Sequence, residues 1–177
     1  MRTIAQLIAS ENRAEGPFLR SGGVVHLLDA NQRDVVAMAI AKASQVHKVP
    51  VPILCAFIRG EGNFDPAAED PNRQNYPLKP GVSPIANTDY GIAQVNGRPD
   101  LGGWAGLYDS LEYLCNEIIQ NVLWAAGKGY PVEVGYDAYN HGRSGAEQRY
   151  KTGIIKLMLN DYGRLVASRV KQYQDVI

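Results

Sequence analysis

Glu61 is the residue whose position most favours acid–base chemistry. It ends an otherwise apolar helical run, with Phe57 and Ile58 four and three residues before it on one helical face and Phe64 three residues after it. Burial beside apolar side chains disfavours the charged carboxylate and raises its pKa, as a general acid working near neutral pH requires. A solvated glutamate at a helix end is the alternative that this position alone leaves open.

Three short motifs follow one another along residues 51–142. Residues 61–68 read Glu-Gly-Asn-Phe-Asp-Pro-Ala-Ala, residues 89–96 read Asp-Tyr-Gly-Ile-Ala-Gln-Val-Asn, and residues 138–142 read Ala-Tyr-Asn-His-Gly. They resemble, in the same order, the Glu-Ser-x-Phe-Asn/Asp-Pro-x-Ala, Gly-Leu-Met-Gln and Ala-Tyr-Asn-Ala-Gly motifs of lytic transglycosylases. The second motif is even more similar to the Thr-Asp-Tyr-Gly-Ile-x-Gln-Ile-Asn stretch of animal-type lysozymes. About half of the chain therefore resembles the lysozyme-like superfamily.

The resemblance implies a mostly α, lysozyme-like fold, in which a helical lobe and a small loop or hairpin lobe form a substrate cleft. We expect one domain of residues 1–177 with a catalytic core at about 31–145. The implied activity is that of a muramidase, which cleaves the β-1,4 bond between MurNAc and GlcNAc in peptidoglycan. Glu61 would act as its general acid and base.

The class of reaction depends on a second carboxylate. A retaining hydrolase needs a nucleophile and an inverting one a base for water, and Asp89 matches the second acidic residue of animal-type lysozymes. Lytic transglycosylases use neither, because the sugar's own 6-hydroxyl attacks, and Tyr139 fits that class as a residue that holds the acid in place. Asp89 as a turn residue and Tyr139 as a buried, satisfied tyrosine remain open alternatives. Asp65 and Asp70 are weaker candidates for a water-activating base.

Five further residues are expected to bind the sugars. Gln94 and Asn96 carry amides suited to N-acetyl groups, whereas Tyr90 and Trp104 offer rings for stacking. Asn140 belongs to the third motif.

Two residues depart from the family motifs. Gly62 stands where the family has serine, so a hydrogen bond that positions the acid is either missing or supplied elsewhere. His141 replaces a small residue and either lines the cleft or faces solvent, which we favour. Residues 69–83 form an insertion with prolines within it and directly after it, and this insertion is expected to reshape the cleft.

Apolar residues at helical spacing predict two helices before the site. The first covers residues 31–49 with Asp29 or Asn31 as its cap, and the second carries Pro52 in its first turn and ends near residues 60–62.

The chain after the acid alternates between irregular and helical patterns. Pro, Gly, Asn and Asp make residues 63–106 a long irregular lobe. The remaining expected elements are a short hairpin at about 85–95, a third helix at 109–126, a shorter fourth helix at 132–139, and a helical tail from 147 with breaks at Gly153 and Gly163.

The composition narrows the range of partners. Eighteen Lys and Arg balance eighteen Asp and Glu, which disfavours nucleic acid and anionic membranes as partners. A neutral glycan strand of peptidoglycan fits, and the implied chemistry needs no metal or cofactor. We expect a monomer without membrane insertion. Cys55 and Cys115 lie in apolar stretches and are expected to be buried thiols rather than a disulfide, although a bridge stays possible.

The start of the chain contains no apolar run of the length that a signal peptide needs. An enzyme that acts in the periplasm or cell wall would then be delivered by a holin, by a virion or by a specialised secretion system. This favours a phage endolysin or virion-associated lysin over a bacterial wall-remodelling enzyme. A sugar-binding or structural descendant of the enzyme and a chitinase are the competing functions, although a non-catalytic descendant would be expected to have lost its acid.

Overall fold

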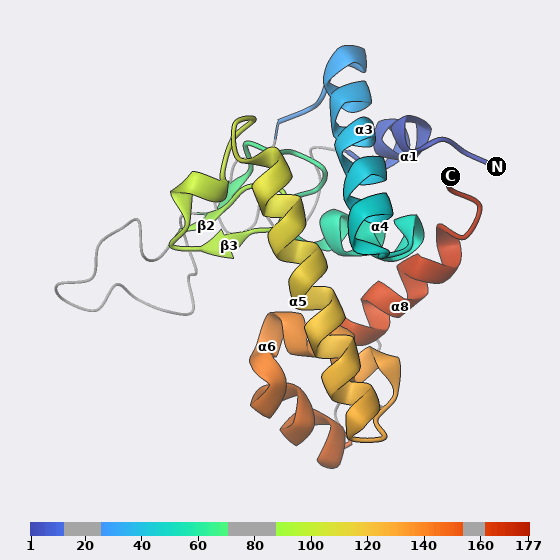
Figure 1. Ribbon diagram of the computed structural model, residues 1–177, viewed down its shortest axis with the longest axis vertical. Helices are drawn as coiled ribbons and strands as arrows, with labels where there is room; N and C mark the ends of the chain where they lie inside the picture. The colour runs from blue at the N-terminus through green and yellow to red at the C-terminus, as the bar shows by residue number, and fades with distance from the viewer. Residues whose placement is uncertain (13–25, 71–87, 154–161) are drawn as a thin grey trace, which may run out of the picture.

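A computed structural model describes residues 1–12, 26–70, 88–153 and 162–177 of the chain. The architecture is mostly helical, with one small antiparallel sheet of three strands (Figure 1). The helices are α1 (Ile4–Glu11), α3 (Ala30–His47), α4 (Val51–Gly60), α5 (Leu107–Gly127), α6 (Val132–Lys151) and α8 (Tyr162–Gln172), with a 3-10 turn η2 (Pro99–Leu101). The strands are β1 (Glu69–Asp70), β2 (Asp89–Tyr90) and β3 (Val95–Asn96).

Local signals place the first helices of the core. Asp29 caps α3, since its side chain accepts from the Gln32 backbone N–H while the Gln32 side chain accepts from the Asp29 N–H. Pro52 lies in the first turn of α4, where its missing N–H leaves no intrahelical bond unmade. The predictions for these two helices, and for the third at 109–126, are confirmed to within two residues.

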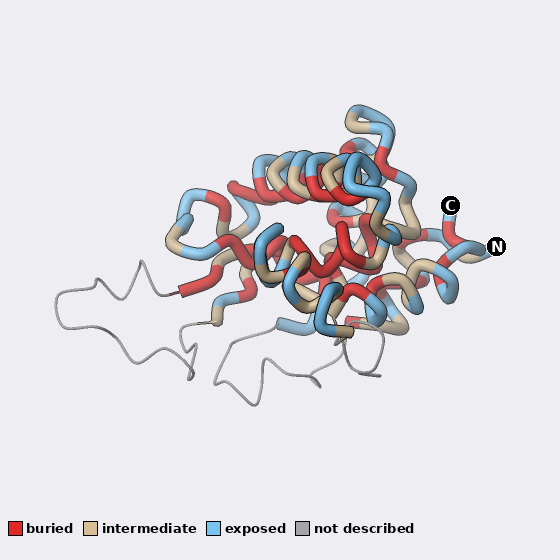
Figure 2. The backbone as a smooth tube through the Cα atoms, turned by 90° about the horizontal axis from the view of Figure 1, so that it is seen from below, coloured by how far each residue is buried: buried red, intermediate tan, exposed pale blue. Residues whose placement is uncertain are grey.

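The core forms where α5 crosses the molecule between α3 and α6 (Figure 1). The helices turn their buried residues towards one another and their exposed residues outwards (Figure 2). Phe57, Leu54 and Ile58 of α4 are fully buried in it, as are Leu111 and Leu114 of α5. Glu61, which caps the carboxyl end of α4, thus adjoins this buried core.

Both cysteines are free thiols in this core. Cys55 lies on α4 and Cys115 on α5, and both are buried. Burial raises the pKa of Cys55 to about 12 and that of Cys115 to about 11. The expectation of buried thiols is confirmed.

The three strands form the small lobe, in the order β1-β2-β3. β2 and β3 make the short hairpin predicted near residues 85–95, of which residues 85–87 lie outside the described part. β1 adds the third, antiparallel strand, which the sequence had not indicated. Apart from β1, the insertion at 69–83 also lies outside the described residues.

The end of the chain corrects one prediction. The helix expected to stop at Tyr139 continues to Gly142, whose φ of 67° interrupts the helical geometry of α6 before the helix resumes. Gly163 is the second residue of α8 and is buried, and a Cβ there would lie 2.1 Å from the carbonyl oxygen of Glu133. α8 therefore approaches α6 more closely than any side chain would allow. The residues before α8, 154–161, lie outside the described part, so a break next to Gly163 stays a prediction. Gly153, with φ of 78°, does end a helix as expected.

The two ends of the chain lie side by side (Figure 1). The Arg2 N–H donates to the carbonyl of Asp175 over 2.9 Å, and the Arg2 guanidinium pairs with the Asp175 carboxylate at 2.7 Å. Across the four described ranges, no helix has both the length and the apolar character that a membrane crossing requires.

Candidate functional site

Glu61 lies at the carboxyl end of α4, where the helix turns into the small lobe. Its backbone N–H still donates to the Phe57 carbonyl over 2.9 Å, which keeps the side chain one turn from Phe57 and on the same face. The side chain is half-buried. The acid predicted from the sequence thus stands between the core and solvent.

Three tyrosine rings pack edge-on around Phe57. Tyr136 and Tyr139 of α6 lie 5.4 Å from it between ring centroids, and Tyr162 of α8 lies 6.1 Å from it. Edge-to-face packing of this kind adds to the stability gained from burial alone. The cluster thus connects α4, α6 and α8 one helical turn before Glu61.

Two of these tyrosines donate hydrogen bonds through their hydroxyls, one to Glu61 and one to the hairpin turn. Tyr162 donates a hydrogen bond to Oε1 of Glu61. Tyr139 donates to the carbonyl of Ala93, 2.7 Å away in the turn between β2 and β3. Burial, and then the charge of Glu61, hold the pKa of both tyrosines well above the usual range. Both hydroxyls therefore stay protonated donors through the neutral range.

The turn after Glu61 packs against the hairpin without an intervening side chain. A Cβ on Gly62 would lie 2.8 Å from both the Cα and the carbonyl oxygen of Ile92. Asn63 and Phe64 follow with φ of 51° and 66°, an unusual conformation for residues with side chains, and fully buried Phe64 anchors the turn in the core. The glycine that departs from the family motif is thus required by this contact, and Tyr162 supplies a hydrogen bond to the acid from elsewhere.

Asp89 lies in strand β2 and not in the turn that begins at Gly91. It is buried, and one carboxylate oxygen accepts a hydrogen bond from the Asn96 amide over 2.9 Å. The charge of Asp89 acts on Tyr139 in the same direction as that of Glu61, so both carboxylates lie within electrostatic reach of one hydroxyl.

Asp70 is the direct cross-strand neighbour of Asp89, and Asn96 is the neighbour on the other side. Opposite residues in antiparallel strands share one face of the sheet, and like charges placed opposite each other destabilise it. The two carboxylates are therefore neighbours on one face of the small sheet.

Gln94 stabilises the hairpin turn through its side-chain amide. Its φ is 49°, and its buried amide donates to the carbonyls of Ala68 at 3.1 Å and Gly91 at 2.8 Å. The first of these hydrogen bonds connects the hairpin turn to Ala68, the residue before β1. The amide NH2 group expected to meet an N-acetyl group is therefore occupied within the protein.

The other predicted binding residues are spread around the site. Tyr90 is half-buried against Gly102, and Trp104 is 40% exposed. Asn140 is exposed on α6, next to Tyr139. His141 is exposed and lies one turn from buried Asp137, with 3.2 Å between its Nδ1 and a carboxylate oxygen. The contact with Asp137 turns His141 towards its own helix.

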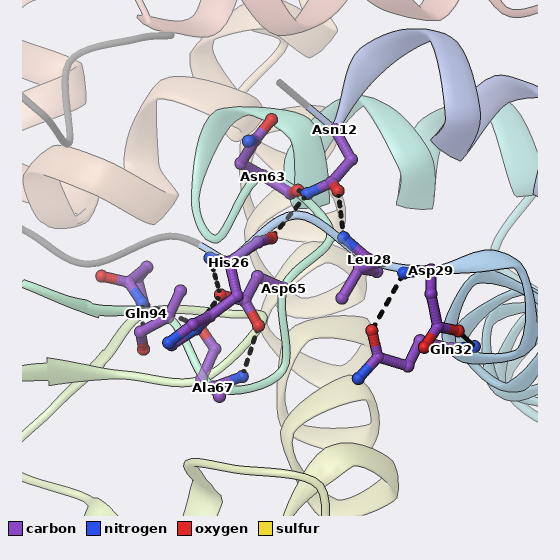
Figure 3. A network of polar contacts seen from close by, with 11 residues as sticks. Asn12, His26, Leu28, Asp29, Gln32, Asn63, Asp65, Ala67 and Gln94 are labelled. Carbon is purple, nitrogen blue, oxygen red and sulfur yellow. Dashed lines mark hydrogen bonds and ion pairs between the residues drawn. The ribbon is translucent and has the colours of Figure 1, made fainter. Parts of the chain in front are cut away.

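Asp65 serves as a structural anchor (Figure 3). One of its carboxylate oxygens accepts from the His26 backbone N–H over 2.6 Å and lies 2.9 Å from the His26 ring nitrogen. The other accepts from the Ala67 N–H over 2.9 Å. Asn12 completes the link by donating to the carbonyls of His26 and Asn63. A buried carboxylate engaged in this way is poorly placed to activate water.

No family model, curated protein or solved structure matches this chain.

Tyr162 is the residue of the site that sequence reasoning missed. It lies outside all three motifs and 101 positions from its partner Glu61. In the sequence it is only a tyrosine next to a glycine in an amphipathic tail, which does not indicate a role in the site. Among the described residues, no group of three or more His, Cys, Asp or Glu side chains is arranged to hold a metal ion.

Proposed function

We propose that this chain is a peptidoglycan-cleaving muramidase with a lysozyme-like fold, in which Glu61 is the general acid. The observation that carries the proposal is the setting of Glu61: a half-buried carboxyl over an aromatic cluster, oriented by Tyr162, beside a sheet that presents Asp89. Motif resemblance and the surroundings of Glu61 both support this role.

Glycosidic cleavage begins with protonation of the leaving oxygen, and Glu61 is suited to give that proton. The aromatic surroundings disfavour its charged form, while the Tyr162 hydroxyl fixes the direction of the carboxyl. The glycan would lie where α4 meets the small lobe, because the charges of Glu61 and Asp89 both act on the Tyr139 hydroxyl there.

Asp89 would stabilise the oxocarbenium-like transition state, as nucleophile or as base for water. The Asn96 amide holds one of its oxygens, so the carboxylate is oriented before substrate arrives. Asp70, its cross-strand neighbour, is the second choice for the same role.

A lytic transglycosylase is the second candidate. It is favoured by Tyr139 and Tyr162, since an enzyme that uses one glutamate as acid and then as base needs that group held firmly. Such an enzyme requires no second carboxylate, and its product ends in 1,6-anhydro-MurNAc.

Digestion of purified peptidoglycan, followed by mass spectrometry of the fragments, tests the proposal. A muramidase releases fragments with reducing MurNAc ends, whereas a transglycosylase releases fragments one water lighter. Faster turnover of chitin oligomers than of peptidoglycan would indicate a chitinase instead. Binding without any fragments would indicate a sugar-binding protein and would refute the proposal.

For the biological setting we propose a phage endolysin or a virion-associated lysin that acts in the bacterial periplasm or cell wall. A secretion-associated wall-remodelling enzyme is the alternative. Lysis of cells only when a holin is co-expressed would support the endolysin.

A further inference from the structure

We propose that Tyr113 and Glu117 of helix α5 bind an uncharged N-acetylated sugar of the substrate, so that α5 forms a wall of the binding site that none of the three motifs contains. The inference rests on the proposed function and extends it to residues that select the sugar. It is carried by the contacts of α5 with the hairpin turn and with α6, which lie on either side of Glu117.

Helix α5 begins beside the small lobe and packs further along against α6 (Figure 1). Near its start, Oγ of buried Ser110 accepts a hydrogen bond from the Ala93 N–H over 3.3 Å. The carbonyl of the same Ala93 accepts from the Tyr139 hydroxyl over 2.7 Å. α5 and α6 thus hold one residue of the hairpin turn between them, and the Ser110 face of α5 is the face next to the Tyr139 hydroxyl.

The same face of α5 continues to a direct contact with α6. Four residues recur at helical spacing and therefore fall in one line along it, namely Ser110, Leu114, Glu117 and Asn121. The carbonyl oxygen of Asn121 lies 3.0 Å from the position of a Cβ on Gly135 of α6. The other three residues of the line are buried, whereas Glu117 is half-buried. Glu117 therefore lies between the two contacts and still reaches solvent.

The charge of Glu117 acts on the same hydroxyl as the two carboxylates of the proposed site. Burial raises the pKa of Tyr139 most, and the charges of Glu61, Glu117 and Asp89 raise it further. Tyr113 lies one turn before Glu117, and burial, followed by the charge of Glu117, raises its own pKa. Glu117 thus belongs to the surroundings of Glu61 and Asp89, although it comes from a different helix.

The carboxylate of Glu117 is free to accept hydrogen bonds from a ligand. Among the described residues, nothing donates a hydrogen bond to it and no cation pairs with it. By contrast, one oxygen of Asp89 already accepts from the Asn96 amide. A carboxylate offers two acceptor oxygens, so Glu117 can receive hydroxyl or amide donors of a bound molecule.

The chemistry of the pair favours an uncharged sugar. A carboxylate accepts hydrogen bonds from sugar hydroxyls and from the N–H of an N-acetyl group, while an aromatic ring offers an apolar surface to the ring of the sugar. Tyr113 is half-buried, so part of its ring is accessible. Glu117 and the two other carboxylates would repel an anionic group. N-acetylglucosamine therefore fits this wall better than a sugar with a free carboxylate.

Binding of the N-acetylglucosamine hexamer to the Glu61→Gln protein, measured by isothermal titration calorimetry, tests the pair without turnover. Addition of Glu117→Ala should raise Kd roughly tenfold or more, since hydrogen bonds to charged groups are among the stronger ones in proteins. Glu112→Ala, exposed on the same helix, is the matched control and should leave Kd unchanged. Equal Kd values in the two variants would overturn the inference, as would failure of the hexamer to bind a protein that cleaves peptidoglycan in its wild-type form.

The ring of Tyr113 is tested in the same way. Tyr113→Ala should raise the Kd of the hexamer roughly fivefold, because the sugar loses an aromatic surface to pack on. Tyr108→Ala is the control, since Tyr108 is also exposed on α5 but lies under the ammonium group of Lys42. That variant should bind as its parent does. An unchanged Kd in Tyr113→Ala would contradict the inference.

Kinetics with peptidoglycan separate binding from a structural role. Loss of a group that binds substrate and transition state equally raises KM and leaves kcat unchanged. We expect this result for Glu117→Ala in the active protein, with a melting temperature close to that of the wild type because alanine favours a helix. A lower kcat at unchanged KM would overturn the inference. Failure of the wild type to cleave peptidoglycan would refute the proposed function instead, so the two failures are distinguishable.

Discussion

Replacement of Gly62 by alanine tests whether the turn that carries Glu61 rests directly on the hairpin. A Cβ at residue 62 would lie 2.8 Å from the Cα and carbonyl oxygen of Ile92 and 2.9 Å from the carbonyl oxygen of Gly91. All three atoms belong to the backbone, so no side chain can rotate to make room. The two turns must move apart.

The size of the effect follows from the distances. Restoring ordinary van der Waals contact requires a separation of about 0.6 Å more than Gly62 allows. Overpacking of this kind costs about 2 kcal/mol of unfolding free energy. For a chain of 177 residues that lowers the melting temperature by about 4 to 8 °C. Because the turn holds Glu61, we also expect kcat to fall by about tenfold or more.

Thermal unfolding and turnover of peptidoglycan measure the two effects side by side. Gly127→Ala is the control, since a Cβ at the end of α5 meets nothing within 4 Å. We expect that variant to unfold at or slightly above the wild-type temperature. If Gly62→Ala matched the wild type in both stability and kcat, the direct contact between turn and hairpin would be refuted.

Three other predictions concern the second carboxylate, a buried ion pair and the thiols. Asp89→Asn should lower the rate of hydrolysis by at least about 100-fold while leaving the fold intact by circular dichroism, and unchanged hydrolysis would remove Asp89 from the mechanism. Asp137 is fully buried and pairs with Arg149 at 3.1 Å. Asp137→Ala should therefore lower the free energy of unfolding by about 3 to 5 kcal/mol in a urea experiment. A decrease of less than about 1 kcal/mol would contradict the pairing. Burial raises the pKa of Cys55 to about 12 and that of Cys115 to about 11, so neither thiol should react with a thiol reagent at pH 8 until urea unfolds the chain. Rapid labelling of the native protein would contradict their burial.

The sequence predicts those parts of the fold that depend on local signals. The cap at Asp29, Pro52 in a first turn and the apolar stripe of α5 each mark a helix without reference to distant residues. Glu61 belongs to this group as well, because the apolar run before it and the motif after it are both contiguous. Its half-buried place at the end of α4 follows directly.

Contacts between distant segments explain what the sequence could not predict. Gly163 has the signal of a helix break, yet it is a glycine because α6 passes too close for a side chain. Nothing near Tyr162 in the sequence indicates its contact with Glu61, since the two residues lie 101 positions apart. The roles of polar side chains are equally hard to predict. In the motifs Gln94 looks like a sugar-binding group and Asp65 like a candidate base, but their hydrogen bonds stabilise turns of the protein itself.

The rate at which Glu61→Gln releases soluble fragments from purified peptidoglycan tests the central claim most directly. The substitution keeps the shape of the side chain and removes the transferable proton. Glu112→Gln, on the exposed side of α5, is the matched control and should keep wild-type activity. We predict that Glu61→Gln retains at most about one hundredth of the wild-type rate. A rate close to that of the wild type and of Glu112→Gln would contradict the assignment of Glu61 as the catalytic acid.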